Sequence, residues 1–276
     1  MHNKYIFRGD FLKTKTVVLT GAGSGLGREA AITLAKRGHK VIATTQYDIQ
    51  SKELNILAQD KNIDLHAFKL DINLEEDRNK LNNLEFDVLI NNAAIGDSGS
   101  IAEIKVDRIE NVFETNVFSN IKITQIALKK LIQNKRGRII FLSSLAGKIS
   151  MPFLGPYCSS KFAIEGFASS LRKEMKKLDG TNIQIGIIEP GAYATGFNKE
   201  NNDKKYEWMY NDSYFKYKWK DIKEKETRYW NFIEKKNFNS IINQYIKAVE
   251  DVKVKFRYTA PKSQALFIQF QRIFGL

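Results

Sequence analysis

Residues 15–27 read KTVVLTGAGSGLG, and this stretch decides the fold of the chain. Its first half is apolar and β-branched, which predicts a buried strand over 15–20. A glycine cluster follows, then an apolar-periodic segment up to Gly38 that predicts a helix, then a second strand over 40–44. Such a βαβ unit offers the unpaired N–H groups of the helix N-terminus to a pyrophosphate. Glycine clusters also make ordinary turns, but a cluster between a strand and a helix indicates dinucleotide binding.

The alternation of strands and helices continues along the chain. Further strands are expected at 65–70, 86–90, 138–142, 182–188 and 255–258. Helices are expected at 49–58, 74–81, 106–132 (with a break near its start), 157–178, 238–249 and 264–274. This pattern predicts an α/β fold with a Rossmann-like, doubly wound parallel sheet in one domain over 15–276, whose ligands lie beyond the carboxyl ends of the strands. Residues 1–14 are interpreted as an N-terminal extension on the edge of that domain.

Composition limits the class of protein. With 276 residues and 43% hydrophobic content, the chain can form one sizeable core. It has no apolar run of the ~20 residues that a membrane span needs, and its N-terminus lacks the apolar region of a signal peptide. The single cysteine, Cys158, excludes an internal disulfide and indicates a reducing, cytoplasmic location. The three scattered histidines indicate that no metal site is present.

The net charge of +13 permits a nucleic-acid or acidic-membrane partner. The basic residues are nevertheless spread along the chain, with richer stretches at 199–236 and 247–272. We therefore expect a solvated basic surface, with a few charges used by cofactor phosphates, and no specific nucleic-acid partner. Binding to nucleic acid would require retention that falls steeply with salt and that bound cofactor does not alter.

A second informative stretch, residues 144–161, reads SLAGKISMPFLGPYCSSK. An apolar strand ends just before Ser144, and Tyr157 and Lys161 then lie one helical turn apart on the same face. An ammonium beside a phenol favours the phenolate and lowers the tyrosine pKa, and a serine hydroxyl can bind the same reacting oxygen. The three residue types together suit reduction of a carbonyl or oxidation of an alcohol.

The Tyr-x-x-x-Lys spacing is weak evidence by itself, because it also occurs at Tyr214/Lys218 and at Tyr258/Lys262. Pro261 disfavours a continuous helix through the last pair. Only the first pair follows a serine at a strand end. Cys158, beside Tyr157, is interpreted as a small packing residue rather than a redox switch, because no second cysteine can pair with it.

Residues 192–235 break the alternation and contain YEWMYNDSYFKYKWKDIKEKETRYW at 206–230. We interpret them as a substrate-binding lid whose aromatics face an apolar pocket. An amphipathic helix pair or a partner interface is the alternative. Residues 262–276 are expected to form an apolar C-terminal helix, whose basic residues suit peripheral contact with a membrane surface.

Taken jointly and in order, several motifs resemble the classical short-chain dehydrogenase/reductase (SDR) family over about residues 15–260. The motifs are Thr20-Gly21-x-x-x-Gly25-Leu26-Gly27, Asp71, Asn91-Asn92-Ala93, Asn116, Ser144, Tyr157 with Lys161, and Pro190-Gly191-x-x-x-Thr195. The resemblance implies an NAD(P)-dependent oxidoreductase that transfers a hydride between the nicotinamide cofactor and a carbonyl or secondary alcohol. Ala94 departs from the pattern, since the family usually has glycine there.

The resemblance also implies roles for four catalytic residues. Tyr157 is the acid/base, Lys161 binds the nicotinamide ribose and lowers the tyrosine pKa, and Ser144 holds the substrate oxygen. Asn116 holds a water in a proton relay, with a local bond inside its helix as the alternative. The homodimer or homotetramer of the family forms through the long helices that contain Asn116 and Tyr157.

The implied cofactor-binding residues form a larger set. They are Gly21, Ser24, Gly25, Leu26, Gly27, Thr45, Gln46, Asp71, Ile72, Asn92, Ala93, Tyr157, Lys161, Pro190, Gly191 and Thr195. Within this set the resemblance places Asp71 beside the adenine, Asn92 near the adenosine ribose and Thr195 at the nicotinamide carboxamide.

Cofactor preference depends on the end of the second strand. An acidic residue there holds the ribose 2′-OH of NAD, and a basic one receives the 2′-phosphate of NADP. Thr45 occupies the acidic position and neutral Gln46 follows it. The lack of a carboxylate favours NADP, with Arg28 or Arg37 as candidates to approach the phosphate, and NAD is the alternative.

The substrate is expected to be a lipophilic alcohol or ketone, such as a steroid-, retinol- or lipid-like molecule. The aromatic lid suits such a substrate, and the tail from Phe256 resembles that of family members that act on them. A reductase of 3-oxoacyl thioesters and a non-catalytic nucleotide-binding sensor are the alternatives.

Overall fold

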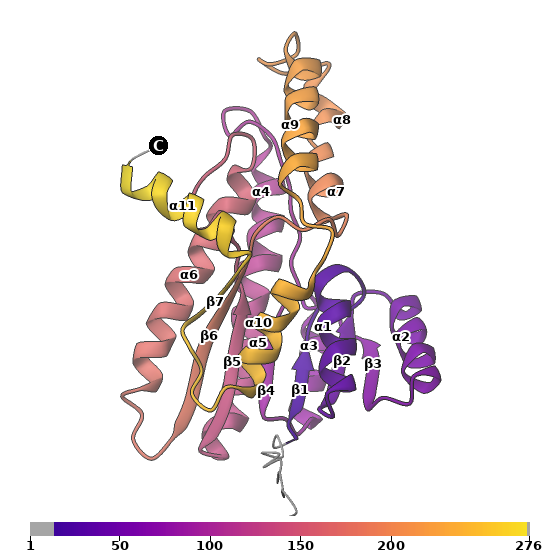
Figure 1. The fold of residues 1–276 in the computed structure, drawn as a ribbon, viewed down its shortest axis with the longest axis vertical. Coiled ribbons are helices and arrows are strands. Elements are labelled where there is room, and N and C mark those ends of the chain that lie inside the picture. The colour runs from indigo at the N-terminus through magenta and orange to yellow at the C-terminus, as the bar shows by residue number, and fades with distance from the viewer. Residues whose placement is uncertain (1–13, 275–276) are drawn as a thin grey trace, which may run out of the picture.

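The computed structural model describes residues 14–274, so nearly all of the predicted N-terminal extension lies outside the described residues. A seven-stranded parallel sheet forms the centre of the fold, in the order β3-β2-β1-β4-β5-β6-β7 (Figure 1). The strands are β1 (Thr16–Leu19), β2 (Lys40–Thr45), β3 (Leu65–Lys69), β4 (Val88–Asn91), β5 (Arg136–Leu142), β6 (Asn182–Pro190) and β7 (Arg257–Ala260). The strand order reverses between β1 and β4, which creates a ligand-binding crevice at their carboxyl ends. The predicted doubly wound α/β fold is therefore confirmed.

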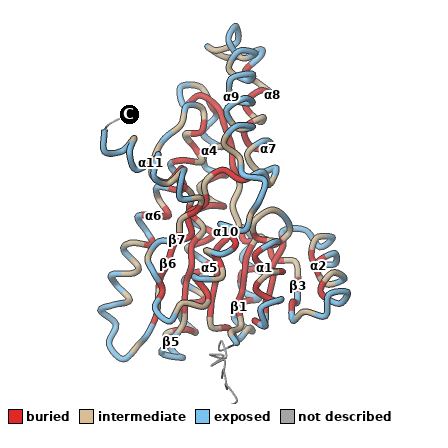
Figure 2. Tube along the Cα trace, in the orientation of Figure 1, coloured by how far each residue is buried: buried red, intermediate tan, exposed pale blue. Residues whose placement is uncertain are grey.

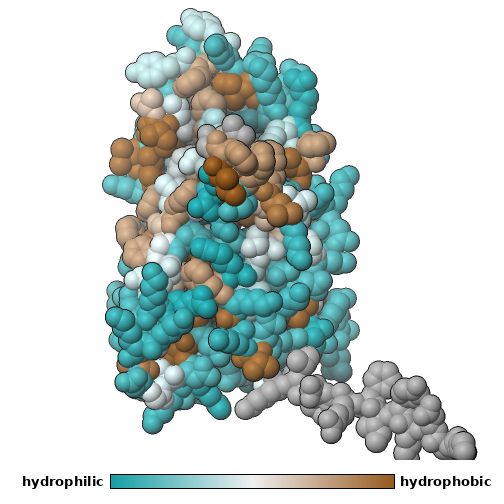
Figure 3. All heavy atoms as spheres, turned by 60° about the vertical axis from the view of Figure 1, so that its left-hand side comes forward, coloured by the Kyte–Doolittle hydropathy of each residue, from teal (hydrophilic) through white to brown (hydrophobic). Residues whose placement is uncertain are grey.

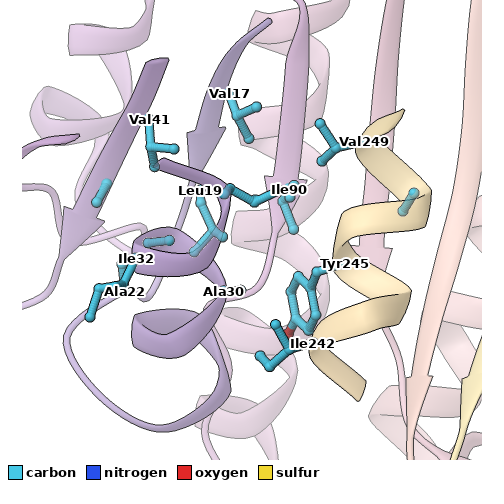
Figure 4. Packing of buried hydrophobic residues seen from close by; sticks show 14 of the residues in the cluster. Val17, Leu19, Ala22, Ala30, Ile32, Val41, Ile90, Ile242, Tyr245 and Val249 are labelled. Atoms are coloured by element: carbon cyan, nitrogen blue, oxygen red, sulfur yellow. The ribbon is translucent and has the colours of Figure 1, made fainter. Parts of the chain in front are cut away.

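Helices cover both faces of the sheet. On one face lie α1 (Gly25–Lys36), α2 (Asp48–Asp60) and α10 (Asn239–Glu250), and on the other lie α5 (Asn120–Gln133) and α6 (Gly155–Met175). Successive residues of β1 point to opposite faces: Val17 and Leu19 pack towards α1 and α10, as Figure 4 shows, whereas Val18 packs with the α5 side. Both faces of the central strands are thus buried, which explains why β1 and β4 are continuous apolar runs rather than alternating ones.

The long helix predicted at 106–132 is interrupted in its middle and not near its start, so that part of the prediction was wrong. It consists of α4 (Val106–Phe113), a π-helical segment η2 (Glu114–Ser119) and α5. The wider turn of a π-helix is a change in backbone hydrogen bonding that hydrophobic periodicity does not reveal, and such segments are common at functional sites. Here the segment contains Asn116.

Shorter helices fill the connections: α3 (Glu75–Asn79) and the 3₁₀ turns η1 (Lys80–Asn83) and η3 (Leu145–Gly147). The helix α11 (Lys262–Phe274) follows the last strand. No helix among the described residues is long and apolar enough to cross a membrane.

Residues 192–235, which we call the arm, contain α7 (Phe197–Asp203), α8 (Tyr206–Met209) and α9 (Trp219–Ile233). The arm rises beyond the carboxyl edge of the sheet (Figure 1), and it is mostly exposed where the strands are buried (Figure 2). No residue of α9 is fully buried. This lack of a buried face explains why the sequence of the arm shows no clean period.

Arg138 of β5 binds the carboxyl end of α10. Its guanidinium donates to the carbonyls of Val249 and Asp251, each at 2.6 Å, and to that of Ala248 at 3.1 Å. The Lys15 ammonium also donates to the Val249 carbonyl. These cations satisfy carbonyls that have no partner inside the helix and offset its negative dipole end. The last third of the chain is thereby attached to the centre of the sheet.

Candidate active site

The glycine loop between β1 and α1 leaves no room for side chains. Gly21 has a φ of +68°, and a Cβ on it would lie 2.6 Å from the Cα of Ala93. A Cβ on Gly27 would lie 2.4 Å from the Gly21 carbonyl oxygen, and a Cβ on Gly25 would lie 3.4 Å from the Cβ of Thr195. The loops after β4 and β6 therefore converge on the glycine loop, as the sequence predicts.

The N-terminus of α1 is suited to an anion. The side chain of Ser24, its N-cap, makes no capping bond, and no acidic residue lies in the first turn. Free N–H groups and the helix dipole both attract a phosphate. With the close-packed glycines beside them, these residues fit a dinucleotide, and Gly21, Ser24, Gly25, Leu26 and Gly27 would hold its pyrophosphate.

The side chain of Asn92, the residue that the resemblance places near the adenosine ribose, is hydrogen-bonded within the protein. Its amide nitrogen donates to the carbonyls of Thr20 at 2.9 Å and Gly21 at 3.0 Å, and its amide oxygen accepts from the Tyr245 hydroxyl at 2.7 Å. The amide is thus used within the protein, where it fixes the glycine loop against β4 and α10. Sequence analysis missed Tyr245 because α10 carries no motif and shows only an apolar row.

The adenosine end of the predicted site is only partly as expected. Thr45 is buried, and its hydroxyl donates to the Tyr47 carbonyl at 2.9 Å, so it is turned away from a ribose. Gln46 is exposed, with its amide nitrogen 3.4 Å from the Asp71 carboxylate. Ile72 is buried behind Asp71. Gln46 and Asp71 are therefore the side chains that this edge offers to an adenosine.

Arg37 was wrongly considered for the 2′-phosphate. It follows the carboxyl end of α1, at the opposite end from the glycine loop, and its Nε lies 2.6 Å from the Glu250 carboxylate. Arg28 lies in the first turn of α1, and its guanidinium is 3.7 Å from the exposed Glu53 carboxylate. Of the two arginines, Arg28 alone lies beside the loop.

Ser144, Tyr157 and Lys161 come together at the carboxyl end of β5. The Ser144 hydroxyl accepts from the backbone N–H of Ala146 at 3.1 Å and donates to the Pro190 carbonyl at 3.4 Å. Burial raises the pKa of Tyr157, and the nearby Ser144 hydroxyl offsets this only in part. A protonated phenol therefore faces the serine.

Lys161 lies beneath Tyr157, with its ammonium 5.6 Å from the centre of the ring. The ammonium donates to the Leu142 carbonyl at 2.9 Å. Burial lowers the pKa of Lys161 to about 8, while the charge of Glu165 acts to raise it. The pKa of Tyr157 is thus shifted opposite to the expected direction, because desolvation of the buried phenol is the largest effect on it.

Asn116 is held by protein groups on three sides. Its amide oxygen accepts from the Ile95 N–H at 2.8 Å, and its amide nitrogen donates to the Ile95 carbonyl at 2.8 Å and to the Ser160 hydroxyl at 3.0 Å. The side chain joins η2, the loop after β4 and α6. These bonds join distant segments, so they are not the bond inside its own helix that was weighed against the proton relay.

One aromatic of the arm reaches Tyr157, and a second packs close by. The centre of the Phe197 ring lies 5.6 Å from that of Tyr157. Trp230, like Tyr157 and Met151, packs against buried residues that include Leu154. The sequence predicts aromatics here but does not single out these two, because only the path of the arm brings them to the site.

A charge cluster of Lys148, Glu165, Glu189 and Arg257 lies behind Lys161, and its two carboxylates are buried. The Arg257 guanidinium donates to Glu165 at 2.5 Å and to Glu189 at 2.9 Å, and the Lys148 ammonium lies 2.8 Å from Glu189. Burial raises the pKa of Glu165. Glu165 extends the i, i+4 row of Tyr157 and Lys161, a signal that was present in the sequence.

The two other Tyr-x-x-x-Lys pairs have no such surroundings. Tyr214 is highly exposed in the turn before α9, and Tyr258 lies on β7 with its hydroxyl bound to Asp251. Cys158 is buried, and burial raises the pKa of its thiol, which suits a packing role. In the described part of the chain, no group of three or more His, Cys, Asp or Glu side chains is placed to hold a metal ion.

Known proteins share both the sequence pattern and the fold. The profile of the short chain dehydrogenase family matches residues 15–206. The chain belongs to this family. The probable short-chain type dehydrogenase/reductase VdlC of Helicobacter pylori is 35% identical over 198 residues, which cover 68% of this chain and 69% of that protein. Retinol dehydrogenase 8 of Homo sapiens is 32% identical over 191 residues, which cover 66% of this chain and 60% of that protein.

The fold match extends further along the chain. The crystal structure of a short chain dehydrogenase/reductase from Burkholderia phymatum, in complex with NAD, has a TM-score of 0.78 and 18% identity, and it covers 95% of this chain and 94% of its own. Membership of the family makes this chain a nicotinamide-dependent oxidoreductase. Its substrate and the roles of single residues are matters for proposal.

Proposed function

We propose that this protein transfers a hydride between a nicotinamide cofactor and a lipophilic alcohol or ketone, and that Tyr157 is its acid/base. The convergence of Ser144, Tyr157 and Lys161 at the end of β5, beside the aromatic side chains of Phe197 and Trp230, carries the proposal. A carbonyl oxygen placed there accepts a bond from Ser144 while Tyr157 donates its proton. The bound cofactor supplies or accepts the hydride.

Lys161 fits a supporting role in this chemistry. Only one of its three N–H donors is used by the Leu142 carbonyl, so two are free to bind ribose hydroxyls. The ammonium also favours negative charge on the phenol when an alcohol is oxidised. We propose that Asn116 holds η2 and α6 in a fixed relative position beneath the site. This arrangement keeps a path for the proton in place.

The apolar side chains of Phe197 and Trp230 support a lipophilic substrate. Retinol, which appears in the name of one relative, is a substrate of this kind. Trp230→Ala should raise KM for lipophilic ketones at least about tenfold and leave NADPH affinity unchanged. Trp219→Ala, at the far end of the same helix, is the matched control. Turnover of small polar carbonyls alone would refute the substrate class, and turnover of 3-oxoacyl thioesters in competition with acyl carrier would favour the alternative.

We propose NADP as the preferred cofactor and NAD as the alternative. No carboxylate stands at Thr45 or Gln46, and Arg28 lies beside the glycine loop. Arg28→Ala should weaken NADPH binding about tenfold and NADH binding little, when each is titrated by fluorescence. Arg37→Ala removes the same charge at the other end of α1. If Arg28→Ala changed the affinities for NADPH and NADH by the same factor, relative to the unmodified protein, the role of Arg28 would be refuted.

We further propose that the chain forms a homodimer or homotetramer through α4, η2 and α6. Exposed apolar side chains support this surface: Val106, Phe118, Phe162 and Phe167. The substitution Phe118→Glu should shift the mass measured by light scattering to that of a smaller species. An unchanged mass would refute this interface.

We also propose a cytoplasmic protein that touches a membrane through α11. Figure 3 shows hydrophobic side chains gathered around this helix, above a mainly hydrophilic surface. Its exposed apolar residues are Leu266, Phe267, Phe270, Ile273 and Phe274. Replacement of Phe267 and Phe270 by serine should lower binding to neutral vesicles, and unchanged binding would refute this contact.

A further inference from the structure

The tip of the arm, residues 210–220, projects farthest from the sheet (Figure 1) and exposes aromatic side chains. Tyr210, Tyr214 and Tyr217 are 55%, 81% and 91% exposed. Lys216, Lys218 and Lys220 stand between and beside them and are exposed as well. Exposed tyrosines in such number require an explanation, because a folded protein gains nothing in stability from aromatic rings left in water.

The inner side of the tip is firmly attached to the protein. The ring of Phe215 packs edge-on against Phe153, with the ring centres 5.1 Å apart. The Glu103 carboxylate accepts from the Ser213 hydroxyl at 2.5 Å and from the Tyr214 N–H at 2.8 Å. The outward position of Tyr214 and Tyr217 is thus fixed by contacts on the other side of the same turn.

The charge of the tip is mainly positive. Residues 210–220 read YNDSYFKYKWK, with three lysines and one acidic residue, Asp212. The Lys216 ammonium lies 5.2 Å from the centre of the Tyr217 ring, and that of Lys220 lies 5.7 Å from the centre of the Trp219 ring. Aromatic rings interleaved with cations suit the headgroup region of a bilayer, where tyrosine rings lie between water and hydrocarbon and lysines bind anionic lipids.

We infer that the tip of the arm docks on an anionic lipid surface. The narrow, protruding shape favours a bilayer over a protein partner, which needs a broad interface of roughly 800 Å² on each side. The exposed apolar face of α11 lies at the same end of the molecule (Figure 1), so both segments can contact one membrane. The inference rests on the proposed lipophilic substrate and membrane contact, since a bilayer would hold both.

Vesicle co-sedimentation tests this docking without any measurement of turnover. The unmodified protein should bind phosphatidylcholine vesicles that contain phosphatidylserine more tightly than pure phosphatidylcholine vesicles. Each lysine near an anionic surface strengthens binding roughly fivefold, so the triple variant Lys216→Glu, Lys218→Glu and Lys220→Glu should bind at least about 100-fold more weakly. Tyr214→Ser with Tyr217→Ser should weaken binding to both kinds of vesicle.

A matched control separates docking from net charge. Lys173→Glu, Lys176→Glu and Lys177→Glu make the same change in charge at the carboxyl end of α6, at the opposite edge of the sheet. This variant should keep most of its affinity. Equal loss in both triple variants, or no preference for phosphatidylserine, would overturn the inference, as would a tip variant that loses self-association or DNA binding while it keeps lipid binding. Because binding is measured without substrate, its failure is distinct from failure of the catalytic proposal.

Discussion

Replacement of Arg257 by leucine should lower the free energy of unfolding, because it leaves two buried carboxylates of the charge cluster without this cation. Arg257 donates to both Glu165 and Glu189, and the Glu189 side chain is fully buried. Removal of one partner of a buried ion pair costs about 3–5 kcal/mol. The Arg257 side chain is 38% exposed, so solvent screening reduces the expected loss in free energy of unfolding to about 2–3 kcal/mol at about pH 8.

The loss should depend on pH in a defined direction. Burial raises the pKa of Glu165 above its unfolded value, and removal of Arg257 raises it further. A carboxyl with a raised folded pKa contributes stability below its unfolded pKa, and that contribution is lost as the pH rises through the folded pKa. The deficit of the variant should therefore shrink when the pH falls from about 8 to about 5.5.

Urea denaturation followed by circular dichroism at both pH values measures this deficit. Arg172→Leu is the matched control, because Arg172 lies 4.8 Å from the Phe256 ring and Arg257 lies 4.6 Å from the same ring. The control should lose less than about 1 kcal/mol at either pH. An Arg257→Leu deficit below that value, or one that is equal at both pH values, would refute the argument from buried carboxylates.

Three further experiments have definite expected results. Tyr157→Phe should lower kcat/KM by about 10²–10⁴ without loss of cofactor binding by fluorescence, and unimpaired turnover would remove Tyr157 from the proposed chemistry. Gly21→Ala should destabilise the fold in thermal unfolding because its Cβ would meet Ala93, whereas Gly166→Ala in α6, where a Cβ has no neighbour within 4 Å, should be neutral or stabilising by up to about 1 kcal/mol. Cys158 should react with a thiol reagent only after urea unfolds the protein, since it is buried and its pKa is raised, and rapid labelling of the native protein would contradict this.

Much of the fold was predictable because local pattern and global topology agree in this chain. Short β-branched runs are buried on both faces, so they appear in the sequence as continuous apolar segments. Parallel strands carry their carboxyl ends to one edge, which is why Gly21, Asp71, Ser144 and Pro190 could be expected together before any coordinates were known.

The parts that could not be predicted depend on which partners the polar side chains find in the fold. Thr45 turns inward because the carbonyl of Tyr47, two residues away, accepts its hydroxyl, and Asn92 is held by Tyr245, which lies 153 residues away. Arg37 has the right residue type but sits at the wrong end of its helix. Spacing along the chain indicates which residues share an element, but it does not show which of their polar atoms are already bound.

The attachment of α10 to β5 bears on how this protein is made. The profile match ends at residue 206, yet Arg138 and Asn92, both inside the matched region, bind the carbonyls and the tyrosine of a helix that starts at Asn239. While the ribosome is still translating the arm, the emerging sheet would contain a guanidinium and an amide without these partners. We therefore expect the nascent nucleotide-binding half to stay loosely packed, and open to chaperones and proteases, until the helix has left the exit tunnel.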